Sequence, residues 1–185
     1  NYLNHKEVPK PLQANIVDYY NYVWENGGLE HENSILHELP RTYRTEVALF
    51  LNKDFISRVP IFQDSEPKMV REIVLQLKPM LTCPKEVIFE KGDEAEAMYF
   101  IFSGTVDIFA ENGSILATLS DGAFFGEMAL ISNQKRNATI ISQTYCEMQI
   151  LDKQAFNRVL DRYPEFAKRV HSIFAERKQN NLEKK

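Results

Sequence analysis

The chain has 185 residues and a mass of 21.5 kDa, which is enough for one ordinary domain with a helical appendage. Its 44% hydrophobic and 26% charged residues are typical of a soluble globular protein and argue against wholesale disorder. The formal net charge of −4 argues against a nucleic-acid coat. The absence of an apolar run of about 18 residues argues against a membrane span.

The ends of the chain and its cysteines narrow the class further. The first residues carry no apolar signal core, so secretion is not indicated, and the missing initiator Met predicts a fragment of a longer protein. Cys83 and Cys146 are the only cysteines. Two separated cysteines indicate neither a disulfide framework nor a zinc knuckle, so we expect free thiols in a reducing cytosol.

The N-terminal third has the spacing of short helices. Pro11 is expected at the start of a first helix that ends at Gly27 and Gly28. A short helix is predicted over residues 33–39, and Pro40 opens the next one, which leads through residues 54–59 to Pro60. Helices this short make a poor independent core, so we expect them to pack on another part of the protein.

The central third has the pattern of strands. Short runs rich in aromatic and β-branched residues are separated by turn residues, and the pair Asn112-Gly113 is a strong hairpin signal. About eight strands at this spacing predict a closed sandwich, jelly roll or small barrel. The runs with strand character cover residues 86–90, 98–102, 105–109, 114–119, 137–143 and 145–151.

Helices are predicted on both sides of this region. Before it, Asp64-Ser65 caps a helix that runs through Lys78 and is ended by Pro79. After it, Asp152 caps a helix to Arg162, and a last helix begins at Glu165 and fades into the polar tail 178–185.

The predicted fold class is therefore α+β. We expect a helical linker over residues 1–64 and a binding domain over residues 65–185. The domain holds an antiparallel, jelly-roll-like β-roll at about 80–151, closing helices at about 152–181, and a C-terminal lid helix.

The stretch that carries chemistry interrupts the strands with one helical turn at residues 127–131. Gly126 stands directly before this turn, where a glycine lets a ligand approach the backbone closely. The free amides of such a turn favour an anion, and Arg136 adds a bidentate charged clamp. Glu127 beside a phosphate makes sense if its carboxylate accepts hydrogen bonds from sugar hydroxyls.

These motifs resemble a known family. Residues 125–130 (FGEMAL) with 136–139 (RNAT) resemble the phosphate-binding cassette of cyclic nucleotide-binding domains. Residues 18–20 (DYY), 34–39 (SILHEL) and 59–62 (VPIF) look like the C-linker of cyclic nucleotide-gated and hyperpolarisation-activated channels. The resemblance covers nearly the whole chain.

The resemblance implies roles for individual residues. Arg136 would bind the cyclic phosphate and Glu127 the ribose 2′-hydroxyl. The amides from Gly126 through Met128 to Ala129 would close the cassette.

Three further positions are implied around the base. Arg177 looks like the residue of the last helix that reaches over the purine, and Leu119 and Met128 look like its apolar neighbours. Asn137 stands where the family often has Thr or Ser, whose hydroxyl is linked with guanine contacts, so cAMP is favoured over cGMP.

Each assignment has a structural alternative. Without its sequence context, Arg136 would be interpreted as a solvated or surface-paired arginine. Glu127 reads as a first-turn acid that stabilises a helix dipole. Arg177 reads as a solvated residue on an exposed helix face.

The function implied by the resemblance is that of the cytoplasmic sensing region of a channel, not of an enzyme. The ligand would be cAMP or cGMP, with no metal or cofactor and no nucleic-acid partner. The region would act on the transmembrane pore of the same polypeptide in a homotetramer.

Other classes fit the sequence less well. The alternative is a cyclic nucleotide-binding regulatory domain of a non-channel protein, such as a kinase regulator or a transcription factor fragment. A transcription factor needs a helix-turn-helix after the last helix, and a kinase regulator would usually show a second roll; neither is present in this sequence. A cupin-type metal enzyme needs clustered histidines, and none of the four lies between Met80 and Asp152.

Overall fold

The computed structural model describes residues 6–25 and 38–183. The chain divides into two compact units, residues 1–44 and 45–185. The predicted boundary between linker and binding domain at residue 64 concerns their roles and stays a prediction.

In the first unit, helix α2 spans Lys10–Glu25 and begins one residue before the predicted Pro11. Its side chains include exposed Tyr20 and Trp24. The predicted stop at Gly27-Gly28 lies outside the described residues, as does most of the predicted helix 33–39. Helix α4 (Arg41–Leu51) begins directly after Pro40, as predicted, and continues into the second unit.

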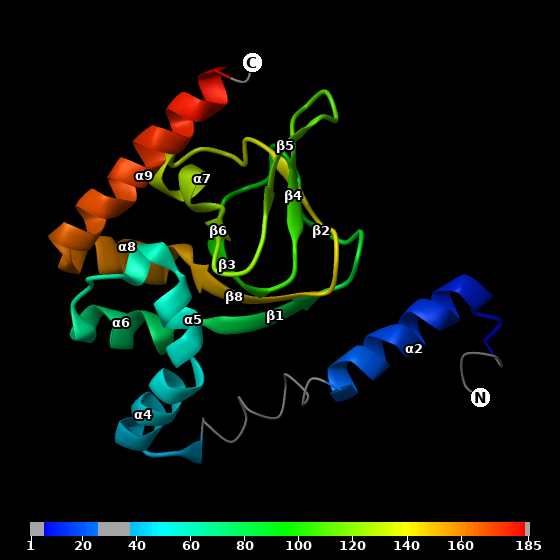
Figure 1. Ribbon diagram of the computed structural model, residues 1–185, viewed down its shortest axis with the longest axis horizontal. Helices are drawn as coiled ribbons and strands as arrows, with labels where there is room; N and C mark the ends of the chain where they lie inside the picture. Colours follow the sequence, from blue (N-terminus) through cyan, green and yellow to red (C-terminus); the bar gives the residue numbers. More distant parts are fainter. Residues whose placement is uncertain (1–5, 26–37, 184–185) are drawn as a thin grey trace. The chain divides into compact units, whose positions relative to one another are not determined.

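The second unit is built on two four-stranded antiparallel sheets, which confirms the predicted β-roll (Figure 1). One sheet has the order β1-β8-β3-β6 and the other β2-β7-β4-β5. Gly113 has φ +79° at the turn between β4 and β5, in agreement with the predicted hairpin. The strands are β1 Lys78–Thr82, β2 Val87–Phe89, β3 Ala97–Ser103, β4 Val106–Phe109, β5 Ile115–Leu119, β6 Phe124–Phe125, β7 Thr139–Ser142 and β8 Cys146–Asp152.

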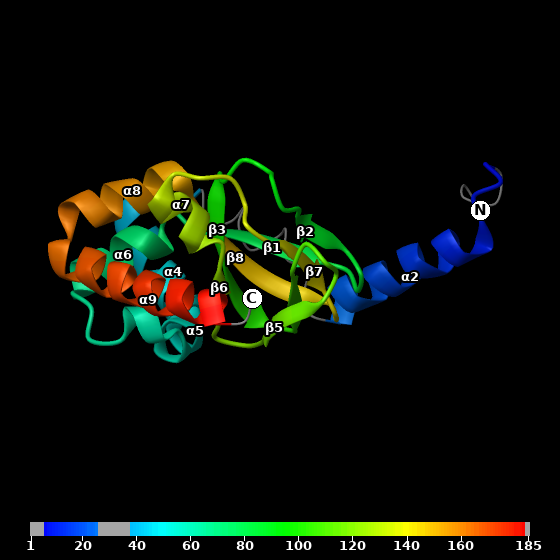
Figure 2. The same ribbon diagram turned by 90° about the horizontal axis from the view of Figure 1, so that it is seen from above.

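Within the second unit, α5, α6, α8 and α9 gather on one side of the roll in both views (Figures 1 and 2). Their apolar faces and the adjoining sheet form the larger core cluster, which contains Phe55, Phe100 and Phe156. A smaller cluster, including Phe125 and Met148, fills the interior of the roll. The helices of this unit after α4 are α5 Lys53–Arg58, the 3-10 helix η1 Pro60–Phe62, α6 Pro67–Val74, α7 Glu127–Ser132, α8 Lys153–Arg162 and α9 Pro164–Glu183.

The predicted helix from Asp64-Ser65 through Lys78 was wrong at both ends. Helix α6 begins at Pro67, and Glu66 precedes it without a side-chain cap. Lys78 and Pro79 belong to β1, where Pro79 lies opposite Gln149 of β8. A proline is tolerated there because β1 is an edge strand, so its missing N–H removes no hydrogen bond from the sheet interior.

The C-terminal helices follow the prediction more closely. The Asp152 carboxylate accepts a 2.8 Å hydrogen bond from the amide of Ala155, which confirms it as the cap of α8. Helix α9 spans Pro164–Glu183, so it begins one residue before the predicted Glu165 and ends just beyond the predicted limit of about 181. A proline suits the first helical position because that N–H has no partner within the helix.

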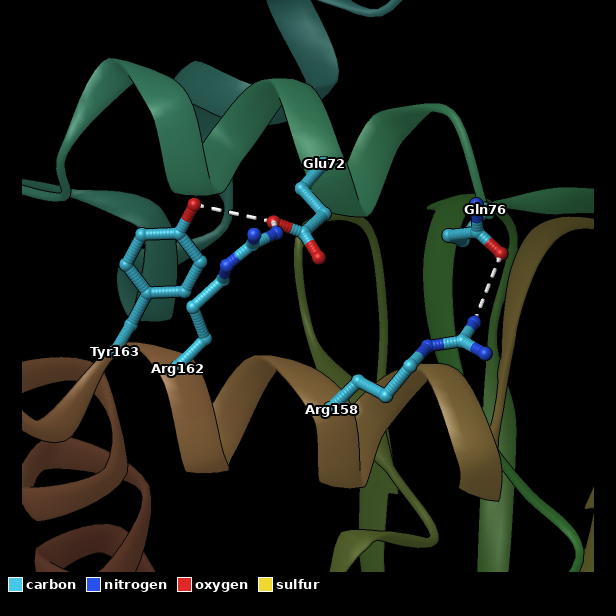
Figure 3. A network of polar contacts seen from close by, with 5 residues as sticks. All are labelled: Glu72, Gln76, Arg158, Arg162 and Tyr163. Carbon is cyan, nitrogen blue, oxygen red and sulfur yellow. Dashed lines mark hydrogen bonds and ion pairs between the residues drawn. The ribbon is translucent and has the colours of Figure 1, made fainter.

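Polar contacts tie α6 to α8 (Figure 3). The Glu72 carboxylate accepts hydrogen bonds from Arg162 at 3.0 Å and from the Tyr163 hydroxyl at 3.1 Å. Arg158 donates to the Gln76 side chain at 3.3 Å. Because Tyr163 lies between α8 and α9, the Glu72 contact holds α6 at the point where the last helix begins.

Candidate ligand-binding site

The turn between β6 and α7 requires glycine. Gly126 has φ +86° and precedes α7, whose start at Glu127 agrees with the predicted helical turn. A Cβ at this position would lie 2.9 Å from Arg136 Nη1 and 3.3 Å from the carbonyl oxygen of Ala97. A side chain would therefore strain the backbone and displace the arginine beside it.

Arg136 is buried, with 4% of its surface exposed, so it is not a solvated surface residue. Its Nη1 donates to the Gly126 carbonyl at 2.7 Å and its Nη2 to the Ala97 carbonyl at 2.6 Å. The buried Nε has no hydrogen-bond partner. Burial lowers the pKa of the Arg136 guanidinium from its usual value, but arginine remains protonated in proteins.

Glu127 is 1% exposed and lies in the first turn of α7, so the alternative of an acid that stabilises the helix dipole remains open. Its Oε1 accepts from Arg177 Nη1 at 2.6 Å, whereas its buried Oε2 has no partner. Burial raises the pKa of the Glu127 carboxyl above its usual range, and the nearby arginine charges oppose this only in part.

Arg177 brings the last helix to the same turn. Its Nη1 donates to the carbonyl of Phe124 at 3.0 Å as well as to Glu127. Its guanidinium carbon lies 4.4 Å from the centre of the Phe124 ring. The reading of Arg177 as a free residue on an exposed helix face is therefore wrong in this structure.

The remaining predicted site residues are placed around this group. Leu119 packs against the cluster inside the roll, and Met128 is half-buried in α7. Ala129 is buried, and Asn137 is exposed. Hydrogen bonds thus join Arg136 to Gly126 and Arg177 to Glu127, which follows Gly126 in the chain.

Sequence reasoning missed the groups that support Arg136. Phe89 faces its guanidinium at 4.0 Å, and Ala97 supplies a carbonyl from 39 positions earlier in the chain. Phe89 lies in the strand predicted at residues 86–90, and Ala97 lies one residue before the strand predicted at residues 98–102. The strand pattern shows that a side chain is half-buried but not which charged group it meets.

The buried carboxyl of Glu127 should make the free energy of unfolding depend on pH. Because the folded protein holds a proton on Glu127 more readily than the unfolded chain does, the ionised carboxylate lowers stability at neutral pH. As the pH falls from neutral toward about 4.3, the ordinary Glu value, this loss should be recovered in the wild type.

Glu127→Gln lacks the titrating group, so the difference in free energy of unfolding between the two proteins should change with pH. The variant should be more stable relative to the wild type at about pH 7 than at about pH 5. Urea unfolding at several pH values measures this difference. A constant difference across the range would contradict the assignment.

Two further features concern the described residues, 6–25 and 38–183. No helix in these ranges is long and apolar enough to cross a lipid bilayer. Within the same ranges, no group of three or more His, Cys, Asp or Glu side chains is placed to hold a metal ion.

The stretch of sequence that forms this site resembles known proteins. Residues 82–163 match the cyclic nucleotide-binding domain family. The chain is 33% identical over 174 residues to the cyclic nucleotide-gated channel cone photoreceptor subunit alpha of Gallus gallus, covering 90% of this chain and 24% of that protein.

Similar values are found for mammalian proteins. Identity is 32% to cyclic nucleotide-gated channel alpha-3 of Homo sapiens, over 90% of this chain and 25% of that protein. It is 34% to cyclic nucleotide-gated channel alpha-4 of Rattus norvegicus, over 89% of this chain and 30% of that protein. The chain thus spans about a quarter of the length of these relatives. It contains a cyclic nucleotide-binding domain preceded by N-terminal helices, and its relatives are cyclic nucleotide-gated channel subunits.

Proposed function

We propose that this region binds a cyclic nucleotide, cAMP in preference to cGMP, and passes the change through the N-terminal helices to a channel pore. One observation carries the proposal. Among the described residues, the buried side-chain atoms without a hydrogen-bond partner are Arg136 Nε and Glu127 Oε2. Buried polar atoms are normally paired, so two orphans beside one glycine turn indicate a missing partner.

The two atoms have complementary chemistry. Arg136 Nε is a charged donor, which suits a phosphate oxygen. Glu127 Oε2 is an acceptor, which suits a ribose hydroxyl. A cyclic nucleotide carries both groups a short distance apart, and the missing side chain of Gly126 lets Arg136 lie against the turn.

The Arg177 contact is compatible with binding. Glu127 Oε1 is held by Arg177, so Oε2 remains for the ribose 2′-hydroxyl. Arg177 would then reach the base while α9 stays next to the turn, with Leu119 and Met128 as apolar neighbours. The amides from Gly126 to Ala129 would complete the cassette around the phosphate.

The output of binding is proposed from the relatives. Their names describe cyclic nucleotide-gated channels, so we place this region on the cytoplasmic side of a membrane, acting on a pore in a homotetramer. Residues 1–64 would serve as the linker and residues 65–185 as the binding domain. A ligand can shift such an equilibrium only by binding one state better, with coupling of about 1–3 kcal/mol as the usual scale.

Titration calorimetry with cAMP and cGMP tests the proposal directly. We expect saturable binding of both, tighter for cAMP. The open-chain nucleotide 5′-AMP is the matched ligand control, because it has the same base and sugar without the cyclic phosphate. A folded protein that gives no heat with either cyclic nucleotide would contradict the proposal.

The nucleotide preference depends on Asn137. Asn137→Thr supplies the hydroxyl that the family often has at this position, so the ratio of the dissociation constants should move toward cGMP. The side chain is exposed, and the substitution should therefore change stability by less than about 0.5 kcal/mol. Calorimetry with both nucleotides measures the ratio, and an unchanged ratio would remove the reason for preferring cAMP.

A further inference from the structure

The guanidinium of Arg136 is held at three places. The carbonyls of Gly126 and Ala97 accept hydrogen bonds from its two terminal nitrogens. The Phe89 ring lies against it, with 4.0 Å between the ring centre and the guanidinium carbon. Tyr99 is more distant, at 5.8 Å.

The ring contributes something that the carbonyls do not. The hydrogen bonds from the two terminal nitrogens lie near the guanidinium plane. They leave the group able to rotate about the line that joins these two nitrogens. An aromatic face against a cation restrains that rotation and attracts the charge through the ring quadrupole. The unpartnered Nε edge is thereby kept in one direction.

Phe89 is itself firmly placed. The pairing of β2 with β7 shifts register between Val87 and Phe89, so that Phe89 lies opposite Ile140. Irregularities of this kind redirect a side chain and are frequent next to functional sites. The ring also packs on Phe125 at 6.0 Å and on Tyr99 at 5.7 Å between ring centres.

We propose that Phe89 is a positioning residue for ligand binding, whose ring fixes the plane of the Arg136 guanidinium so that its Nε edge faces the cyclic phosphate. This role rests on the proposed function. Phe89 acts through Arg136 and does not itself touch the ligand.

Phe89→Leu is the first test, because it keeps an apolar side chain and removes the aromatic face. Binding of cAMP, measured by calorimetry, should weaken by about tenfold. Phe89→Tyr restores the face and should return the affinity to within about threefold of the wild type. Phe109→Leu is the matched control: this half-buried phenylalanine lies in β4 of the same sheet, and its loss should change affinity by less than about twofold.

A second test separates positioning from general loosening of the roll. In an Arg136→Lys background, the ammonium is a point charge with rotatable donors and no plane to fix. Phe89→Leu should therefore weaken cAMP binding clearly less in that background than in the wild type. An equal loss in both backgrounds would overturn the positioning role.

The outcomes distinguish this role from the function on which it rests. Tight cAMP binding by the wild type with unchanged affinity in Phe89→Leu would overturn the positioning role alone. A folded wild-type protein that binds neither cyclic nucleotide would overturn the proposed function and the role together. Thermal unfolding of each variant verifies that the compared proteins are folded.

Discussion

Arg136→Ala is expected to weaken cAMP binding by roughly 3–5 kcal/mol, which is two to four powers of ten in the dissociation constant. The reason is the burial of the guanidinium. Because only 4% of its surface is exposed, Arg136 holds its charge in a place that water hardly reaches. Water therefore would not replace the lost donor in the variant. Its loss would leave the phosphate of the ligand without a charged partner in a largely desolvated place.

The same substitution should also lower stability. It removes a part-buried hydrogen bond to the carbonyl of Gly126 and a buried one to that of Ala97, and hydrogen bonds to charged groups contribute about 1.5–3 kcal/mol each. Calorimetry and urea unfolding must therefore be carried out on the same protein, so that lost affinity is measured on folded molecules.

Lys135→Ala is the matched control for charge. Lys135 precedes Arg136 in the chain, but its ammonium is exposed and pairs with Glu94 at 3.5 Å on the surface. Such pairs contribute little, so affinity should stay within about twofold of the wild type. Wild-type affinity in Arg136→Ala would mean that another residue binds the phosphate.

The centre of the candidate site could be predicted because its signal is local. A glycine before a helical turn, followed ten residues later by an arginine, is visible in the sequence of Gly126, Glu127 and Arg136. What surrounds these residues is not local. The carbonyl of Ala97 and the ring of Phe89 reach Arg136 only because strands distant in sequence meet in the roll.

The fold, like the site, could be predicted from the sequence where the signal is local. Strands β3 and β8, which were predicted as short apolar runs between turn residues, were found nearly at their limits. Strand β1 was missed because Pro79 usually ends an element, and only the sheet order shows that it occupies an edge. Strand β6 has two residues, too few for any periodicity.

Phe100→Ala is expected to lower the free energy of unfolding by about 3–5 kcal/mol, the usual range for a buried phenylalanine. Phe100 is 1% exposed and belongs to the larger core cluster. Its ring packs on Phe55 at 5.7 Å, Phe62 at 5.2 Å and Phe124 at 6.1 Å between ring centres. It therefore joins α5 and η1 to the strand that precedes the glycine turn.

Urea unfolding followed by circular dichroism measures this loss. Phe50→Ala is the matched control, because the same substitution at a side chain that is 77% exposed should change stability by less than about 0.5 kcal/mol. Phe100→Leu should lose clearly less than Phe100→Ala, since it leaves a smaller cavity. Equal stability of Phe100→Ala and Phe50→Ala would mean that α5 and η1 are not packed on the roll as described. In that case the truncation of Phe100 would create no cavity in a packed core.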